Sequence, residues 1–378
     1  MKIAVNAQLL LFDRLEGIGR FAYETLVRMA RNHPEHTFLL VHDRKADARW
    51  DFPDNVQWVA TRLPSRHPFL WYLRFHWEIP ALLRRHKPDI FFSPDGWSIP
   101  GSWPKVVVLH DLNFLKHPEN LPFFTRIYFR YFFPSYARQA NKLITVSRFS
   151  AQDIHETLGV PLADIGMVYN AAGPDFKPLS DSENQSTRQT YNLGNAYQLF
   201  LGAQIPRKNL PRLLQALDLL WQEQPNAPNL LIVGEAMWSG SKVDLAVQGL
   251  KNPDKVRFTG RLQRNEVAKV VAAAHTLLLP SLFEGFGIPV LEAMACGVPV
   301  LTSNCSSLPE VAGDAAVLVD PYSIADIKKG IERVLNDAPL RMRCSEQGLK
   351  RAAEFSWDRS AQELYAQIEG VFLRDNLK

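Results

Sequence analysis

The feature that most constrains this chain is an alternation of short apolar, β-branched segments with amphipathic helical patterns, which runs twice along the sequence. In the front half the predicted strands are residues 2–9, 37–43, 56–60, 89–94, 105–111 and 142–147. The alternation restarts in the back half with residues 197–203, 229–235, 256–260, 276–280, 298–303 and 315–320. Strands that alternate with helices form parallel sheets covered on both faces, so the pattern predicts an α/β protein with two doubly wound, Rossmann-like sheets.

The segment between the two halves has a different composition. Residues 174–196 are rich in Ser and Asn and show no apolar periodicity, so we expect a linker with a short helix. This gives an N-terminal domain of residues 1–173 and a C-terminal domain of residues 197–357, which face each other across a cleft. The last helical pattern, residues 358–378, is expected to pack back on the first domain. Ligands of such sheets bind beyond the carboxyl ends of the strands.

Composition excludes several classes of protein. The three cysteines, Cys296, Cys305 and Cys344, form neither a disulfide framework nor a metal-binding spacing, which favours a reducing compartment. The N-terminal segment is typical of a first strand rather than a signal peptide, and we expect no membrane-spanning segment. The net charge of +4 is too weak to indicate a nucleic-acid partner.

Two glutamates flank a glycine loop in the stretch "SLFEGFGIPVLEAMACGVPV". Glu284 lies on the predicted loop and Glu292 in a helix predicted from Pro289 to Ala295. Gly285 and Gly287 allow a ligand to approach the backbone, and the free amides of a helix start bind anions. Carboxylates beside that site would accept hydrogen bonds from hydroxyl groups, so the combination indicates a nucleotide-sugar. The alternative is that both acids only stabilise the helix dipole.

A second helix start carries two cations. Arg207 and Lys208 precede a helix for which Asn209 is the expected N-cap and Pro211 lies in the first turn. This position suits a diphosphate and the charge that develops on it when a glycosidic bond breaks. A solvated surface pair is an equal alternative.

Two features of the front half also suggest ligand contacts. His110 ends a predicted strand, where parallel sheets present functional groups. The sequence "GIGRFA", with Gly17 and Gly19, matches G-x-G-x-x-A, and Asp43 lies at about the distance of a ribose-binding acid. A nicotinamide-dependent oxidoreductase is therefore an alternative, although several residues separate the first strand from Gly17.

Residues 281–321 resemble the donor-binding region of the family 4 glycosyltransferases, which are retaining enzymes of the GT-B fold. The family's E-x7-E spacing is that of Glu284 and Glu292. The segments "VVVLHDLNFLKHP", "LITVSRFSAQDI", "VYNAAGPDFKP", "LGAQIPRKNLPRLLQAL" and "VRFTGRL" also match in family order, so the resemblance covers nearly the whole chain.

The resemblance implies roles for the glutamate region. Glu284 would contact the hydroxyls of the donor sugar, and Glu292 would bind the two ribose hydroxyls. The amides of Gly285, Phe286 and Gly287 would hold the sugar and the diphosphate.

It implies further donor contacts elsewhere. Lys208 and Arg207 would bind the diphosphate, with Arg207 replacing an arginine that many members carry where this chain has Ala203. Gly17 and Gly19 would face the donor phosphates. His110 would contact the donor sugar or the acceptor, and the backbone of Thr259 and Gly260 would border the base.

The resulting assignment separates catalytic from donor-binding residues. The residues expected to act in catalysis are Glu284, His110, Arg207 and Lys208. The residues expected to bind the donor are Gly17, Gly19, Thr259, Gly260, Gly285, Phe286, Gly287 and Glu292. The sequence lacks the Asp-x-Asp motif of metal-dependent sugar transferases, so neither a metal nor a cofactor is expected.

The resemblance implies a metal-independent, retaining hexosyltransferase of cell-envelope polysaccharide synthesis with a glycan or lipid-linked acceptor. "PRKNLPRLL" is similar to mannosyltransferase-type members, which favours GDP-mannose as donor, with UDP-sugars next. The alternatives are an NAD-dependent oxidoreductase and a non-catalytic sugar-nucleotide-binding relative. The expected location is the cytoplasm, at the inner face of the cell membrane.

Two stretches bear on that location. Residues 67–88 and 126–142 combine aromatic side chains with arginines and lysines. They are typical either of helices that touch an anionic membrane or of core helices with a solvated cationic face.

Overall fold

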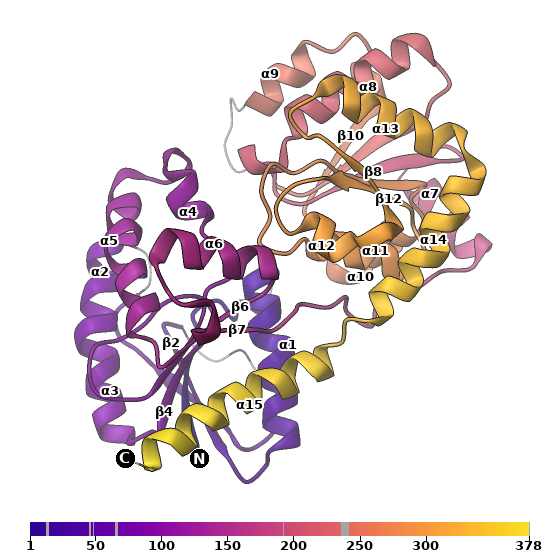
Figure 1. Cartoon of the computed structure of the whole chain (residues 1–378). Coiled ribbons are helices and arrows are strands. Elements are labelled where there is room, and N and C mark those ends of the chain that lie inside the picture. Colours follow the sequence, from indigo (N-terminus) through magenta and orange to yellow (C-terminus); the bar gives the residue numbers. More distant parts are fainter. Residues whose placement is uncertain are drawn as a thin grey trace. The chain divides into compact units, whose positions relative to one another are not determined.

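A computed structural model describes residues 1–12, 15–44, 47, 49–64, 67–191, 193–235 and 242–377, apart from the side chains of Asn120 and Lys242. The chain forms two compact units (Figure 1). Unit 1 consists of Met1–Asn170 and Trp357–Lys378, and unit 2 of Ala171–Ser356. The two parallel sheets expected from the alternation are confirmed, one in each unit.

The described part of unit 1 is built on a seven-stranded parallel sheet of order β3-β2-β1-β4-β5-β6-β7. Its strands are β1 (Lys2–Asn6), β2 (Thr37–His42), β3 (Val56–Ala60), β4 (Ile90–Ser93), β5 (Lys105–Val108), β6 (Lys142–Thr145) and β7 (Ile165–Met167). The central strands are buried along their whole length, because helices cover both faces. Strand β7 was not predicted, since three residues that include a glycine are too few for a recognisable pattern.

Helices of unit 1 cover this sheet. They are α1 (Gly17–Asn32), α2 (Pro68–Leu73), the π-helical η2 (Arg74–Glu78), α3 (Ile79–His86), α4 (Asn113–Lys116), η3 (Pro118–Asn120), α5 (Phe123–Gln139), α6 (Arg148–Leu158), η4 (Leu162–Asp164) and α15 (Trp357–Asn376). Ser147 is the N-cap of helix α6, with its hydroxyl accepting the Ser150 amide at 3.0 Å.

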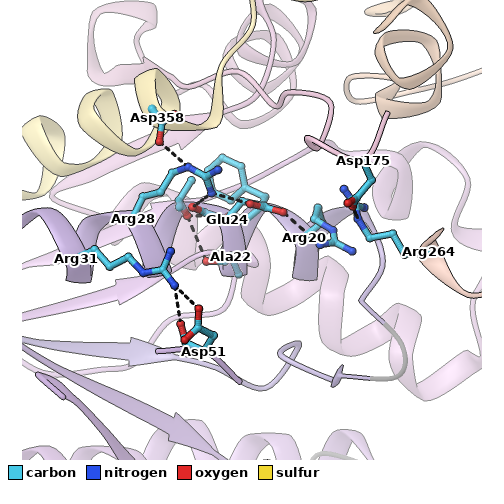
Figure 2. Close-up of polar contacts among 11 residues, drawn as sticks. Arg20, Ala22, Glu24, Arg28, Arg31, Asp51, Asp175, Arg264 and Asp358 are labelled. Carbon is cyan, nitrogen blue, oxygen red and sulfur yellow. Dashed lines mark hydrogen bonds and ion pairs between the residues drawn. The ribbon is translucent and has the colours of Figure 1, made fainter. Parts of the chain in front are cut away.

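The C-terminal helix α15 packs on α1 within unit 1. Phe21 and Trp357 meet edge to face with ring centroids 6.3 Å apart. Figure 2 shows Arg28 of α1 between Glu24 of the same helix, at 2.6 Å, and Asp358 of α15, at 2.8 Å. A buried apolar contact with ion pairs at its edge therefore holds the last helix on α1.

The described part of unit 2 is built on a six-stranded parallel sheet of order β10-β9-β8-β11-β12-β13. Its strands are β8 (Tyr197–Leu201), β9 (Asn229–Val233), β10 (Val256–Gly260), β11 (Thr276–Leu279), β12 (Val300–Ser303) and β13 (Ala316–Val319). The helices are α7 (Asp181–Thr190), η5 (Pro206–Lys208), α8 (Leu210–Glu223), α9 (Lys242–Gln248), η6 (Pro253–Lys255), α10 (Arg264–Ala272), α11 (Ile288–Ala295), α12 (Leu308–Ala312), η7 (Gly313–Ala315), α13 (Ile324–Asn336) and α14 (Ala338–Ala353).

The segment expected to link the domains, residues 174–196, lies inside unit 2. Its helix α7 starts with a capping box between Ser180 and Glu183 and packs on α10. Nearby, Arg264 pairs with Asp175 at 2.7 Å (Figure 2).

Each sheet reverses its strand order once. In unit 1 this occurs between β1 and β4, and in unit 2 between β8 and β11. The loops that leave two such neighbouring strands run to opposite faces of the sheet and open a crevice at its carboxyl edge, where ligands of this architecture bind. Among the described helices, none has the length and apolar character required to cross a membrane.

Candidate functional site

The loops after β8 and β11 bring together the predicted charged residues Arg207, Lys208 and Glu284 of unit 2. The loop after β8 runs through η5 to the start of α8, and the loop after β11 leads into α11. The two loops are joined directly, because the Leu282 amide donates to the Arg207 carbonyl at 2.7 Å. The two loops at the strand reversal of this sheet are therefore held together.

Three charged side chains of these loops meet. The Glu284 carboxylate lies 2.5 Å from Nη1 of Arg207 through Oε2 and 2.7 Å from Nζ of Lys208 through Oε1. The Ser281 hydroxyl also donates to Oε1 at 2.8 Å. The side chains of Glu284 and Lys208 are almost inaccessible, whereas that of Arg207 keeps 23% of its surface exposed. Glu292 also acts electrostatically on Lys208, so two cations and two carboxylates belong to this region, and its accessible cation is Arg207.

The ionisation of this group follows from its surroundings. Burial alone would raise the pKa of Glu284, but Arg207 and Lys208 outweigh it and bring the pKa down to about 2. Burial lowers the pKa of Lys208 below its ordinary value, and the Glu284 carboxylate opposes that shift. Glu284 is therefore a carboxylate at neutral pH.

The loop that carries Glu284 is held by serines from the neighbouring strand end. The Ser307 hydroxyl donates to the carbonyls of Glu284 and Phe286 at 2.8 and 3.0 Å. The Ser306 hydroxyl accepts the amide of Glu284 at 3.2 Å. These bonds fix the backbone that leads into α11.

Gly287 precedes α11 with φ of 102°, a left-handed conformation that a side chain rarely adopts. A Cβ there would stand 2.7 Å from the Leu308 side chain. The helix begins at Ile288, so Pro289 occupies its second position rather than its first. Glu292 lies on this helix and is buried. The glycine thus allows the chain to turn sharply from Glu284 to Glu292.

The expected capping role of Asn209 is wrong. Its side chain makes no cap hydrogen bond to α8 and instead donates to the carbonyls of Pro280 and Pro321 at 3.0 and 2.7 Å. The residue has φ of 62°, and this left-handed turn directs the amide toward the loop after β11. Asn209 therefore ties the loop after β8 to the segments that follow β11 and β13.

Thr259 and Gly260 end β10, two strands away from β8 in the sheet. The Gly260 carbonyl accepts the Gly234 amide at 2.9 Å, which links the ends of β9 and β10. Both predicted base-contacting residues therefore lie at the same carboxyl edge as the charged group of Arg207, Glu284 and Lys208.

His110 belongs to unit 1 and follows β5. Its Nε2 lies 2.8 Å from the Pro94 carbonyl, and its ring meets Phe21 edge to face. A carbonyl only accepts, so Nε2 carries the proton and Nδ1 is the acceptor. Burial lowers the pKa of His110 to about 4, against a small opposing effect of the Pro94 bond. His110 is thus a neutral hydrogen-bonding group at physiological pH.

The predicted glycine loop of unit 1 has a packing role. Gly17 is the first residue of α1, and a Cβ on Gly19 would stand 2.6 Å from the Leu9 carbonyl. Strand β1 ends at Asn6, so the tight strand–turn–helix of a dinucleotide fold is absent from the described residues. The oxidoreductase alternative receives no support from this geometry.

Sequence reasoning missed a buried polar network at the strand reversal of unit 1. Asp95, after β4, accepts hydrogen bonds from Asn6 at 2.8 Å, Gln8 at 2.9 Å and Ser93 at 2.8 Å. Gln8 in turn accepts from Arg74, which is fully buried. Burial raises the pKa of Asp95 against these hydrogen bonds. The position of Asp95 after a predicted strand was the one available signal.

A pocket of about 350 Å³ lies beside this network in unit 1. Gln8, Asp95 and His110 supply polar groups, and Trp97 and Phe133 are among its aromatic residues. A pocket that combines aromatic side chains with a few polar groups suits a polyhydroxylated ligand.

Among the described residues, the histidine and carboxylate side chains close enough to share a cation are those of His33, Glu35 and His36. They precede β2 and thus lie at the amino end of the sheet, away from the carboxyl edge. The expectation that the site needs no metal stays a prediction.

The ion pairs of Glu284 make the free energy of unfolding depend on pH. Since the pKa of Glu284 falls from 4.5 to about 2 on folding, its contribution is complete above about pH 4.5 and disappears as pH falls through about 2. We expect the difference in urea midpoint between wild type and Glu284→Gln to shrink across this window. Urea unfolding followed by tryptophan fluorescence from pH 6 to 2 measures it. A difference that does not change with pH would contradict the assignment.

Two family models match the chain. Residues 15–176 match the model described as Glycosyltransferase Family 4, and residues 181–351 match the model described as Glycosyl transferases group 1. The chain is also similar to the O-antigen chain mannosyltransferase B of Escherichia coli. The two are 31% identical over 361 residues, which cover 91% of this chain and 93% of that protein.

Solved structures with the same fold include sucrose-phosphate synthase from Thermosynechococcus elongatus, with a TM-score of 0.82 at 17% identity over 99% of both chains. Anabaena HepE in complex with UDP-glucose has a TM-score of 0.74 at 17% identity, over 98% of this chain and 100% of that chain. At such identity these likenesses concern the fold alone, which is GT-B.

Proposed function

Because the chain belongs to the group 1 and family 4 glycosyltransferases, we propose that it transfers mannose from GDP-mannose to a glycan or lipid-linked glycan. The choice of mannose is supported by the Escherichia coli O-antigen mannosyltransferase that resembles nearly the whole chain. UDP-sugars are the next candidates, since HepE binds UDP-glucose. The proposed product is an O-antigen-type polysaccharide of the cell envelope.

The observation that carries this proposal is the group formed by Arg207, Glu284 and Lys208 at the strand reversal of unit 2. Its two neighbouring cations suit a diphosphate, and the partly exposed Arg207 can reach an incoming anion. The start of α11 adds backbone amides at the same carboxyl edge of the sheet. In this proposal the diphosphate binds Arg207 and Lys208, and the Glu284 carboxylate then accepts hydrogen bonds from the sugar hydroxyls.

Glu292 is proposed to bind the ribose. It is a buried acid on α11 in the turns that follow Gly287, so a ligand on the amides at the helix start passes close to it. A desolvated carboxylate forms strong hydrogen bonds with paired hydroxyls. Thr259 and Gly260 are proposed to border the base through their backbone.

The proposed transfer retains the configuration at the anomeric carbon. The bond from that carbon to the diphosphate oxygen breaks, and the acceptor oxygen bonds to the same face. The acceptor proton passes to the departing phosphate oxygen. Lys208 and Arg207 stabilise the negative charge that grows on the diphosphate, so no metal is required in this scheme. Neutral His110 accepts a hydrogen bond from a sugar hydroxyl through Nδ1.

The proposed location is the cytoplasmic side of the cell membrane. The cysteines Cys296, Cys305 and Cys344 are all unpaired, as in a reducing compartment.

An assay with purified protein, a mannoside acceptor and EDTA tests the proposal. We expect turnover with GDP-mannose to exceed that with UDP-, ADP- and dTDP-sugars, and proton NMR of the first product to show the anomeric configuration of the donor. An inverted product would contradict the retaining mechanism. Binding of GDP-mannose without any product would instead indicate a non-catalytic relative.

A further inference from the structure

Helices α2 and α5 of unit 1 pack against each other and expose large apolar side chains. Trp71 of α2 stacks on Phe129 of α5 with ring centroids 5.8 Å apart, and His67 lies against Phe124 at 6.3 Å. The exposed side chains of the two helices, between 38% and 74% accessible, are called here the aromatic surface: Phe69, Tyr72, Phe123, Phe124, Ile127 and Tyr131.

Helix α5 has two apolar faces. At roughly 100° per residue, Phe123, Phe124, Ile127 and Tyr131 fall within one arc of about 100°, so they share the exposed face. Phe129 and Phe133 fall on roughly the opposite side and line the 350 Å³ pocket together with Trp71 of α2. The same pair of helices therefore forms a wall of the pocket and an exposed apolar face.

The charge on α5 has one sign. Residues 121–150 contain five cations and no acid. Arg130 and Arg138 of α5 are exposed, and Arg126 lies over the Phe123 ring at 6.0 Å. Aromatic side chains interleaved with arginines suit the boundary of an anionic bilayer, where rings enter the headgroup region and cations meet phosphate.

We propose that the aromatic surface binds an anionic lipid bilayer and thereby holds a lipid-linked acceptor beside the pocket of unit 1. The second half of this statement rests on the proposed function, because it requires a glycan acceptor on a lipid. The first half depends only on exposure and charge. We assign the aromatic surface to a bilayer and not to a protein, because a protein partner of matching charge would have to supply an extended acidic face.

Co-sedimentation with vesicles tests the surface without any turnover. We expect the full chain to bind vesicles of phosphatidylcholine mixed with phosphatidylglycerol and not vesicles of phosphatidylcholine alone. The variant Phe124→Ser/Tyr131→Ser is expected to bind the mixed vesicles about tenfold more weakly. The variant Arg130→Gln/Arg138→Gln is expected to show a similar loss.

The matched control is Leu245→Ser/Met342→Ser, which removes two comparably exposed apolar side chains, 66% and 63% accessible, from unit 2. It is expected to bind like wild type. The proposal would be overturned if the wild-type protein did not bind the mixed vesicles. It would also be overturned if the Phe124→Ser/Tyr131→Ser variant bound them as well as wild type does. Light scattering that shows a wild-type dimer dissociated by this variant would overturn it too, because the surface would then join two copies.

Activity separates the two halves of the proposal. The Phe124→Ser/Tyr131→Ser variant is expected to retain turnover on a soluble glycan and to lose about tenfold on a lipid-linked acceptor in vesicles. Equal loss on both acceptors would contradict the role in acceptor delivery. If wild type turns over neither acceptor, the proposed function fails, and vesicle binding still decides the role of the surface.

Discussion

Replacing Lys208 with methionine is expected to lower kcat about 10²- to 10³-fold. The Lys208 ammonium pairs with Glu284 at 2.7 Å in a buried position, so its charge is little screened by water. The proposed mechanism places negative charge on the diphosphate as the bond breaks, and kcat should therefore fall more than donor affinity. Steady-state kinetics with GDP-mannose, together with the dissociation constant of GDP, measures the two effects.

Stability and a matched lysine control this first prediction. Lys208→Met leaves Glu284 paired with Arg207 and Ser281, so the variant is expected to fold with a lower melting temperature. Lys328→Met removes a cation that pairs with Glu223 and Glu332 on the outside of unit 2, and it is expected to keep wild-type kcat. A Lys208→Met variant that turns over normally would exclude the proposed role of this residue.

Replacing Glu292 with leucine is expected to raise the KM for GDP-mannose about 10²-fold with a smaller effect on kcat. Each hydrogen bond from a ribose hydroxyl to a desolvated carboxylate contributes roughly 1.5–3 kcal/mol, and the change removes the acceptor from both hydroxyls. Glu292 is buried on α11, and leucine is apolar and a strong helix former, so the change is expected to maintain the helix.

A donor that lacks the ribose 2′-hydroxyl isolates this contact. With 2′-deoxy-GDP-mannose the ratio of KM values between Glu292→Leu and wild type should shrink about tenfold, since one of the two bonds is absent from both reactions. If this ratio of KM values were the same for both donors, Glu292 would maintain the local structure and would not bind the ribose.

The sheets were predictable because their strands are short apolar runs bounded by turn residues. Buried parallel strands require such runs, and every strand expected from the sequence is present. Local signals were less reliable at helix starts. Asn209 has the composition of an N-cap, but its left-handed backbone turns the amide away from α8 and toward Pro280 and Pro321.

The individual residues of the site could be predicted from the sequence, but the contacts between them could not. Glu284 and Lys208 were each expected at a helix start or glycine loop, but their ion pair joins loops that are far apart in the sequence. Only the order of strands brings β8 beside β11 and so creates the contact. The same reasoning explains why the Asp95 network escaped prediction, since Asn6 and Asp95 are 89 residues apart.

The most direct test of the proposed diphosphate site in unit 2 is a crystal structure of the complex with GDP-mannose. We expect diphosphate oxygens within hydrogen-bond distance of Lys208 Nζ and of the backbone amides that open α11, with the ribose at Glu292. A complex in which the diphosphate binds elsewhere, while Arg207, Glu284 and Lys208 keep the ion pairs described above, would contradict it.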